Sequence, residues 1–132
     1  MGSLVDGEGN GQPDANAKGD DGMGTPDDED GVSFPALYPG QPAPILVTAV
    51  NTGSTNALLY GYIDWNGNGN FDDAGERQSV VVPAGTNTPT SFTLAFTVSL
   101  AAQLDEPFGA RFRLSTDGAA ANPDGRAIDG EV

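Results

Sequence analysis

The sequence contains no cysteine and no histidine. Disulfide bonds, thiolate zinc sites, cysteine nucleophiles and imidazole acid–base catalysis are therefore excluded from this chain. Lysine is nearly absent as well, because Lys18 and four arginines stand against 19 aspartates and glutamates, giving a net charge of −14. A surface this acidic does not fit the phosphates of nucleic acid. We expect a protein that is not an enzyme and does not bind nucleic acid.

Long apolar runs are also missing. No stretch of about 18 consecutive apolar residues is present, so we expect no membrane insertion. Self-repulsion among the many carboxylates opposes folding unless counter-ions neutralise part of the charge, and divalent cations do so most economically. A salt-rich habitat is the alternative explanation for an acidic, lysine-poor composition. The composition alone leaves both explanations open.

No stretch shows a convincing helical period. From Val32 onward, short β-like runs alternate with Gly, Pro and Asn. Residues 91–98 and 108–114 alternate between apolar and polar side chains, which predicts two half-buried strands, the second with Arg111 and Arg113 facing outward.

Three further runs are more continuously apolar and predict strands that are covered on both sides or lie at the sandwich centre, at residues 45–50, 58–65 and 79–82. Pro42 and Pro44 limit how early the first of these strands can begin. A chain of 132 residues is one domain in size. We therefore predict an all-β fold for residues 32–132, an antiparallel two-sheet β-sandwich of Ig-like or jelly-roll-like type.

Residues 1–31 are acidic and glycine-rich and carry hardly any large apolar side chain. Such a segment cannot bury enough apolar surface to offset its ordering entropy, so we expect it to be loosely structured. Clustered oxygens beside flexible backbone are also what calcium recruits. The segment is thus either a solvated acidic linker or part of a second calcium site, with candidate ligands Asp20, Asp21, Asp27, Asp28, Glu29 and Asp30.

The stretch DWNGNGNFDDAGE, residues 64–76, places side-chain oxygens at alternate positions between glycines. Counted from Asp64, this spacing matches an EF-hand calcium loop, whose oxygens surround a hard cation. The predicted ligands of this first calcium site are Asp64, Asn66, Asn68, Asn70 through its backbone carbonyl, Asp72 and Glu76. Two features depart from the EF-hand: Glu76 comes one residue late, after Gly75, and the loop follows a strand. The asparagines lower the site's charge and predict weak affinity, roughly 10⁻⁴–10⁻³ M as in extracellular modules.

A simpler interpretation of the same stretch is a hairpin. Asn66-Gly67 and Asn68-Gly69 are both good signals for a type I′ turn between apolar strands. A turn accounts for the glycines, but it does not account for oxygens that continue at intervals to Glu76.

Aromatic residues suggest a different function. Tyr60, Tyr62 and Trp65 lie close together on one predicted strand and its exit, as in the sugar platform of a carbohydrate-binding module. Tyr60 and Tyr62 share a face with Leu58, which favours packing in the core. Trp65 is the better candidate for a contact with sugar.

Five blocks of sequence occur in a fixed order: GQPDANAKGDD (11–21), DDEDGV (27–32), YIDWNGNGNFDDAGE (62–76), FGARFRLST (108–116) and AIDGEV (127–132). Together they resemble the GEVED domain of large bacterial secreted and surface proteins. The resemblance runs from about Gly11 to the last residue and is far more specific than the loop alone. It implies an extracellular, non-catalytic β-sandwich module, found among repeats in adhesin-like proteins or appended to secreted enzymes.

We therefore expect a calcium-binding, calcium-stabilised structural or adhesive module of an exported bacterial protein, secreted or at the cell surface. Ca²⁺ is the expected cofactor. The expected partners are calcium ions and neighbouring modules of the same polypeptide, with a glycan or a host or cell-surface ligand as a further candidate. The alternative is a calcium-containing carbohydrate-binding module of a secreted enzyme or adhesin.

Overall fold

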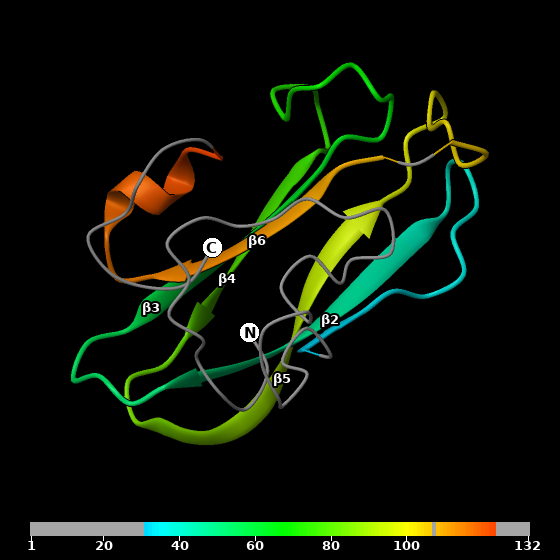
Figure 1. The fold of residues 1–132 in the computed structure, drawn as a ribbon. Coiled ribbons are helices and arrows are strands. Elements are labelled where there is room, and N and C mark those ends of the chain that lie inside the picture. Colours follow the sequence, from blue (N-terminus) through cyan, green and yellow to red (C-terminus); the bar gives the residue numbers. More distant parts are fainter. Residues whose placement is uncertain (1–30, 107, 124–132) are drawn as a thin grey trace, which may run out of the picture.

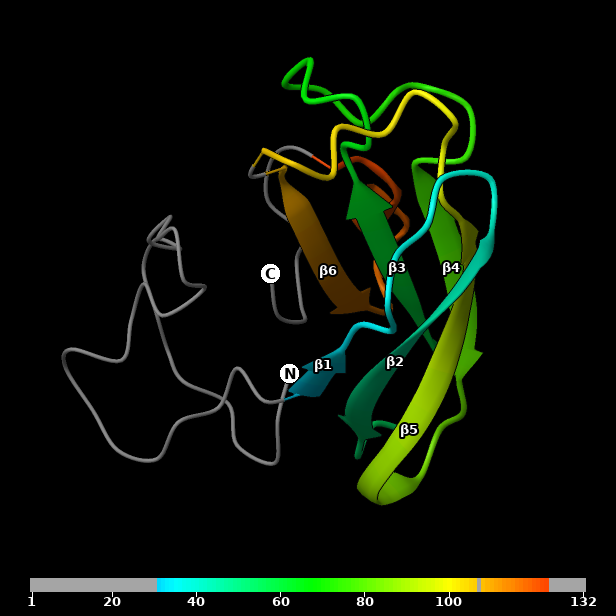
Figure 2. The same ribbon diagram turned by 90° about the vertical axis from the view of Figure 1, so that its right-hand side faces the viewer.

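The computed structural model describes residues 31–106 and 108–123. Within them, six strands form two antiparallel three-stranded sheets (Figures 1 and 2). The first sheet has the order β1-β2-β5, with β1 at Val32–Ser33, β2 at Pro42–Asn51 and β5 at Thr86–Thr97. The second has the order β4-β3-β6, with β3 at Ala57–Ile63, β4 at Arg77–Val82 and β6 at Ala110–Ser115. The prediction of an all-β fold with two antiparallel sheets is confirmed.

Helical structure is minor. One short 3-10 helix, η2 at Gly118–Ala121, follows β6. None of the segments that the structure describes forms a helix with the length and hydropathy needed to cross a bilayer.

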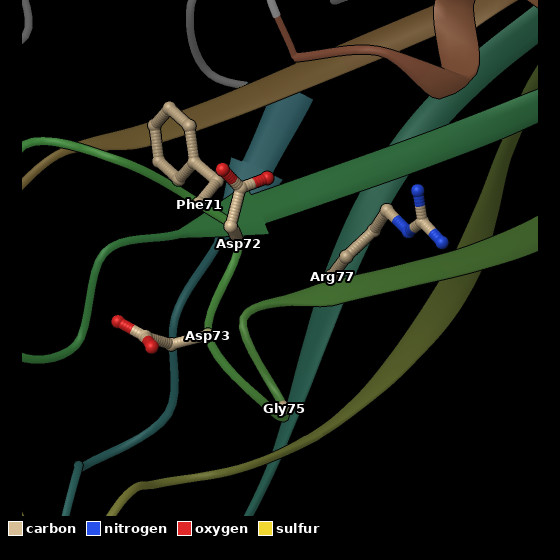
Figure 3. Close-up of a pocket in the computed structure, with 5 residues that line it drawn as sticks. All are labelled: Phe71, Asp72, Asp73, Gly75 and Arg77. Atoms are coloured by element: carbon tan, nitrogen blue, oxygen red, sulfur yellow. The ribbon is translucent and has the colours of Figure 1, made fainter.

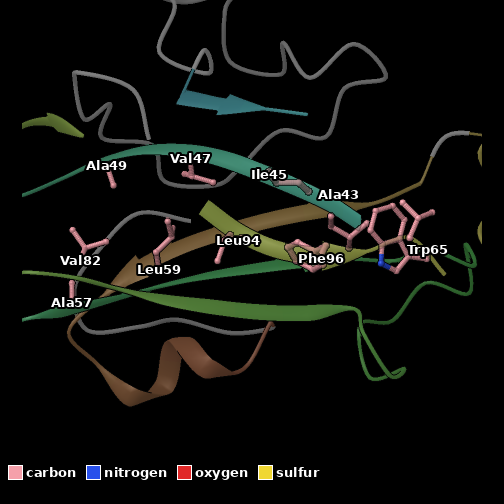
Figure 4. Close-up of a cluster of buried hydrophobic side chains, with 12 residues drawn as sticks. Ala43, Ile45, Val47, Ala49, Ala57, Leu59, Trp65, Val82, Leu94 and Phe96 are labelled. Carbon is pink, nitrogen blue, oxygen red and sulfur yellow. The ribbon is translucent and has the colours of Figure 1, made fainter. Parts of the chain in front are cut away.

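The hydrophobic core lies between the two sheets (Figure 4). The alternation predicted for residues 91–98 is confirmed, because Leu94, Phe96 and Val98 are buried and the residues between them are exposed. Gly61 on β3 allows close packing here, since a Cβ at this position would lie 2.6 Å from Leu94 Cδ1. The other buried members of the core are Ala43, Ile45, Val47, Ala49, Ala57, Leu59, Ile63, Trp65 and Val82.

Of the three strands predicted to be covered on both sides or at the sandwich centre, β2 and β3 are the central strands of their sheets, whereas β4 lies at a sheet edge. Cover on both sides is wrong for β2 and β4. Each has one buried face and one face open to solvent, where Leu46 is 45% exposed and Val81 is 48% exposed. The expected late start of β2 is also wrong, because the strand begins at Pro42. On one edge of β2, the short β1 pairs only with Leu46 and Val47, so this edge is unpaired beside Pro42. Prolines are tolerated there because no partner strand needs their missing N–H.

The outer face of the β4-β3-β6 sheet is covered at one end by the segment that follows β6. Arg113 was expected to face solvent, yet it is buried because residues 118–123 lie over it. Tyr62 is buried as well, but on this outer face and not in the core between the sheets, which corrects the expected core position. Four consecutive backbone carbonyls accept hydrogen bonds from this face: Ala120 from Tyr62 Oη (2.7 Å), Ala121 from Arg77, Asn122 from Arg113 and Pro123 from Arg111.

Candidate metal centre

The loop predicted to bind calcium connects β3 to β4 at one end of the sandwich, at the top of Figures 1 and 2. The strand ladder continues one step beyond the strands, since Ile63 N donates to Glu76 O at 2.8 Å. The segment before β6 holds the start of the loop, because Asp64 N donates to Gly109 O and Gln103 N donates to Trp65 O, both at 2.9 Å. The loop therefore begins from a fixed base.

Asx turns wind the first half of the loop. The side-chain oxygens of Asn66, Asn68 and Asn70 each accept a hydrogen bond at 3.0 Å from the backbone nitrogen two residues later. Asp64 accepts two more, from Asn68 N at 3.1 Å and Gly69 N at 2.8 Å. Gly69 has a φ of 85°, the left-handed conformation that favours glycine. Four of the side chains recognised in the sequence, Asp64, Asn66, Asn68 and Asn70, thus turn an oxygen toward the backbone of one tight coil.

Asp73, which is not among the predicted ligands, closes this coil. Its Oδ2 accepts hydrogen bonds from the side-chain amides of both Asn66 (2.8 Å) and Asn68 (2.7 Å). Asp72, which was predicted as a ligand, lies elsewhere: its carboxylate points away from that of Asp73 (Figure 3). Asp72 and Asp73 both line a shallow pocket with Phe71, Gly75 and Arg77. A doubled Asp-Asp in the sequence gives no signal as to which of the two faces the coil.

Glu76 lies at the base of the coil and is only 1% exposed. Its carboxylate accepts hydrogen bonds from Trp65 N at 3.0 Å and Asp73 N at 3.3 Å. Burial raises the pKa of Glu76 most strongly; the two backbone hydrogen bonds oppose this, while the negative charges of Asp73 and Asp64 raise the pKa further. Among the described residues, the charged groups that act on this buried carboxylate are the carboxylates of Asp73 and Asp64.

Trp65 is buried in the hydrophobic core at the end of the sandwich where the loop begins. Its side chain is 1% exposed and packs against Phe96, with the ring centroids 6.2 Å apart (Figure 4). It also packs against Phe108, whose ring centroid is 5.6 Å away. The indole nitrogen points toward Gly75 O at 3.4 Å. Because this ring is inside the protein, it offers no platform to a sugar, and the buried Tyr62 offers none either.

The chemistry of the loop suits a hard cation only if amides contribute. Within residues 31–106 and 108–123, no group of three or more histidine, cysteine, aspartate or glutamate side chains could hold a metal ion. The loop does bring the side-chain amides of Asn66 and Asn68 to the carboxylate of Asp73, and carboxylate and amide oxygens are both ligands that calcium accepts. The candidate donors are the side chains of Asp64, Asn66, Asn68, Asp73 and Glu76.

The possible second site cannot be placed in this way. Asp20, Asp21, Asp27, Asp28, Glu29 and Asp30 all lie outside the described residues. Their role in binding calcium stays a prediction.

Comparison with protein families addresses the identity of the chain. The family model described as the GEVED domain matches residues 58–132, more than half of the 132 residues. The chain belongs to the GEVED domain family. Neither a curated protein nor a solved structure matches it significantly.

The match to the GEVED domain covers the candidate site completely. It begins within β3 and includes the whole loop, β4, β5 and β6. Three of the five sequence blocks fall inside it, whereas the blocks at residues 11–21 and 27–32 precede it. The structural elements that hold the loop therefore belong to the family's own sequence pattern.

Proposed function

We propose that this GEVED domain binds calcium in the loop formed by residues 64–76 and is stabilised by the bound ion. The observation that carries the proposal is the buried carboxylate of Glu76, whose charged neighbours are the carboxylates of Asp64 and Asp73. Burying negative charge beside more negative charge is costly unless a cation balances it. A divalent cation with oxygen ligands supplies that balance.

The loop's own residues supply the ligands. The proposed ligands are the carboxylates of Asp64, Asp73 and Glu76, which do not by themselves form a group able to hold a metal ion among the described residues, together with the amide oxygens of Asn66 and Asn68. The ion would coordinate the carboxylate of Asp73 in place of the hydrogen bonds that the two amide N–H groups now donate to it. When bound, it supplies a concentrated positive charge that neutralises the site and holds the two halves of the loop together.

Calcium-dependent stability fits a structural or adhesive module of an exported bacterial protein. Calcium that binds only the folded form stabilises it by mass action, by about 2.7 kcal/mol at a hundred times the dissociation constant. Free calcium is scarce inside cells and abundant outside, so export would strengthen the fold. The neighbouring modules of the same polypeptide, and a glycan or host or cell-surface ligand, are the partners that we propose for such a module.

A calcium-containing carbohydrate-binding module is less well supported. The aromatic residues that suggested a sugar platform, Tyr62 and Trp65, are buried. A plain hairpin turn is the other competing interpretation of the loop, and it accounts for the left-handed Gly67 and Gly69. It does not account for a glutamate carboxylate that is buried beneath the turn.

Isothermal titration calorimetry with calcium tests the proposal directly. We expect saturable binding by the wild-type chain, and loss of that binding in Asp64→Asn, which keeps the size of the side chain but removes its charge. Asp105→Asn is the matched control, because Asp105 is exposed and lies outside the loop. Absence of heat with the wild-type chain at millimolar calcium, together with identical melting in calcium and in chelator, would refute calcium binding.

A further inference from the structure

We infer that the loop contains a self-modification site: Asn66 loses its side-chain amide through attack by the backbone nitrogen of Gly67, whereas the neighbouring Asn68 is protected. Both asparagines precede glycine, the residue that least obstructs this reaction because it has no Cβ. The sequence makes the two positions equivalent. The structure distinguishes them.

The reaction needs only water. The Gly67 nitrogen gives its proton to solvent base and attacks Cγ of Asn66, so that a new N–C bond forms. The Cγ–Nδ2 bond breaks and the nitrogen leaves as ammonia, giving a five-membered cyclic imide. Water then opens the ring at one of its two carbonyls, which yields either aspartate or isoaspartate.

The side chains of Asn66 and Asn68 make matched hydrogen bonds. Each Oδ1 accepts a hydrogen bond at 3.0 Å from the nitrogen two residues later. Each Nδ2 donates to the same atom, Asp73 Oδ2, at 2.8 Å and 2.7 Å respectively. The following glycines, Gly67 and Gly69, share the left-handed conformation, with φ of 68° and 85°. The conformation of the following glycine and the hydrogen bonds of the side-chain amide therefore do not separate the two sites.

The attacking nitrogens differ. Gly69 N donates to Asp64 Oδ2 at 2.8 Å, so its proton is held by a carboxylate whose charge also opposes deprotonation of the nitrogen. Within the part of the chain that the structure describes, Gly67 N has no hydrogen-bond acceptor. Because Asn68 is the more exposed asparagine, exposure alone would favour the opposite order.

Deamidation changes the charge of the loop. Conversion of Asn66 to aspartate adds a carboxylate beside Asp64 and Asp73. This consequence rests on the proposed function: one more anionic oxygen would tighten calcium binding, whereas isoaspartate would lengthen the backbone and disturb the coil. The modification itself does not depend on calcium.

The rate at each asparagine is measurable in one sample. The purified chain is incubated in chelator at mildly alkaline pH, and fragment-ion mass spectrometry assigns the mass gain of amide-to-acid conversion to Asn66 or Asn68 over time. We expect Asn66 to react about tenfold faster, since one hydrogen bond to a charged group must be broken at Gly69. The same measurement in denaturant should give nearly equal rates. Equal rates in the folded protein, or faster reaction at Asn68, would overturn the assignment.

Asp64→Ala tests the protecting hydrogen bond, because an asparagine would keep an oxygen able to accept from Gly69 N. Without the Asp64 carboxylate, the rate at Asn68 should rise toward that of Asn66, while the rate at Asn66 changes little. A parallel rise at both positions would show that loosening of the loop, and not the bond to Gly69 N, sets the rates. Calcium titration of Asn66→Asp is a separate measurement: unchanged calcium binding there would count against the proposed calcium site and leave the deamidation order intact.

Discussion

Replacing Glu76 with glutamine removes a buried negative charge while keeping the shape of the side chain. In calcium-free buffer two effects oppose each other. The variant no longer buries a carboxylate beside Asp64 and Asp73, which favours the folded state. The amide can accept only one of the two backbone hydrogen bonds, from Trp65 N at 3.0 Å or Asp73 N at 3.3 Å. We expect the free energy of unfolding to change by no more than about 1 kcal/mol without calcium.

In excess calcium the two proteins should differ strongly. At a hundred times the dissociation constant, calcium should stabilise the wild-type chain by about 2.7 kcal/mol. For a domain of this size that corresponds to roughly 10 °C or more in the melting temperature. The Glu76→Gln variant has lost a carboxylate ligand and should gain little from the same calcium concentration.

Thermal melting in calcium and in chelator, for both chains, measures the difference. Glu106→Gln is the matched control: Glu106 is exposed and lies outside the loop, so its calcium-dependent gain should equal that of the wild type. An equal gain in Glu76→Gln would refute the role of Glu76 as a ligand. A large loss of stability in chelator would refute the view that its charge is costly there.

Two further predictions concern the metal-free protein. Because the pKa of Glu76 is raised in the folded state, its carboxylate destabilises the fold fully above that pKa, and this effect disappears as the pH falls below the unfolded-state value near 4.5. In chelator, chemical denaturation should show that the free energy of unfolding of the wild type rises relative to that of Glu76→Gln as the pH falls. A difference that stays constant with pH would contradict this. Gly61→Ala should cost about 1–3 kcal/mol by overpacking, since its Cβ would lie 2.6 Å from Leu94 Cδ1 and 3.1 Å from Phe112 Cε1. Gly118→Ala is the control in the same assay, because no atom lies within 4 Å of its Cβ. An equal loss of unfolding free energy in both variants would show that the core relaxes around the added methyl group at Gly61.

Alternation of side chains located the strands because it reflects one buried face. It placed β5 well, where Leu94 and Phe96 point into the core. In β2 the outward Leu46 is apolar although it is exposed, so the continuous run suggested cover on both sides, whereas the strand is the central one of its sheet with one face open. The two prolines suggested a late start, but only pairing information shows which edge of a strand is open.

The covered outer face of the second sheet could not be predicted from local pattern. Arg113 occupies an outward position on β6, and an outward arginine normally faces water. Residues 118–123 cover it because their backbone carbonyls match donors on three different strands, from Tyr62, Arg77, Arg111 and Arg113. The acceptors in these hydrogen bonds are backbone carbonyls, which every residue has. The amino-acid sequence therefore does not reveal that this segment covers the sheet.

The late position of Glu76 in the loop follows from strand register. Ile63 and Glu76 stand opposite each other in the extended ladder, just as Tyr62 stands opposite Arg77. Residues directly opposite in antiparallel strands point to the same face, so Glu76 shares the core side with Ile63, while Arg77 points outward.

A glutamate one residue earlier, at the EF-hand spacing, would fall where Gly75 makes its left-handed turn, with a φ of 85°. A loop that closes a β-hairpin must bring its last carboxylate in at the first inward position of the returning strand. The count from Asp64 is therefore set by the sheet and not by the EF-hand, whose returning element is a helix. The same register places the carboxylate under Trp65, where its charge is buried and a cation would have the greatest effect on stability.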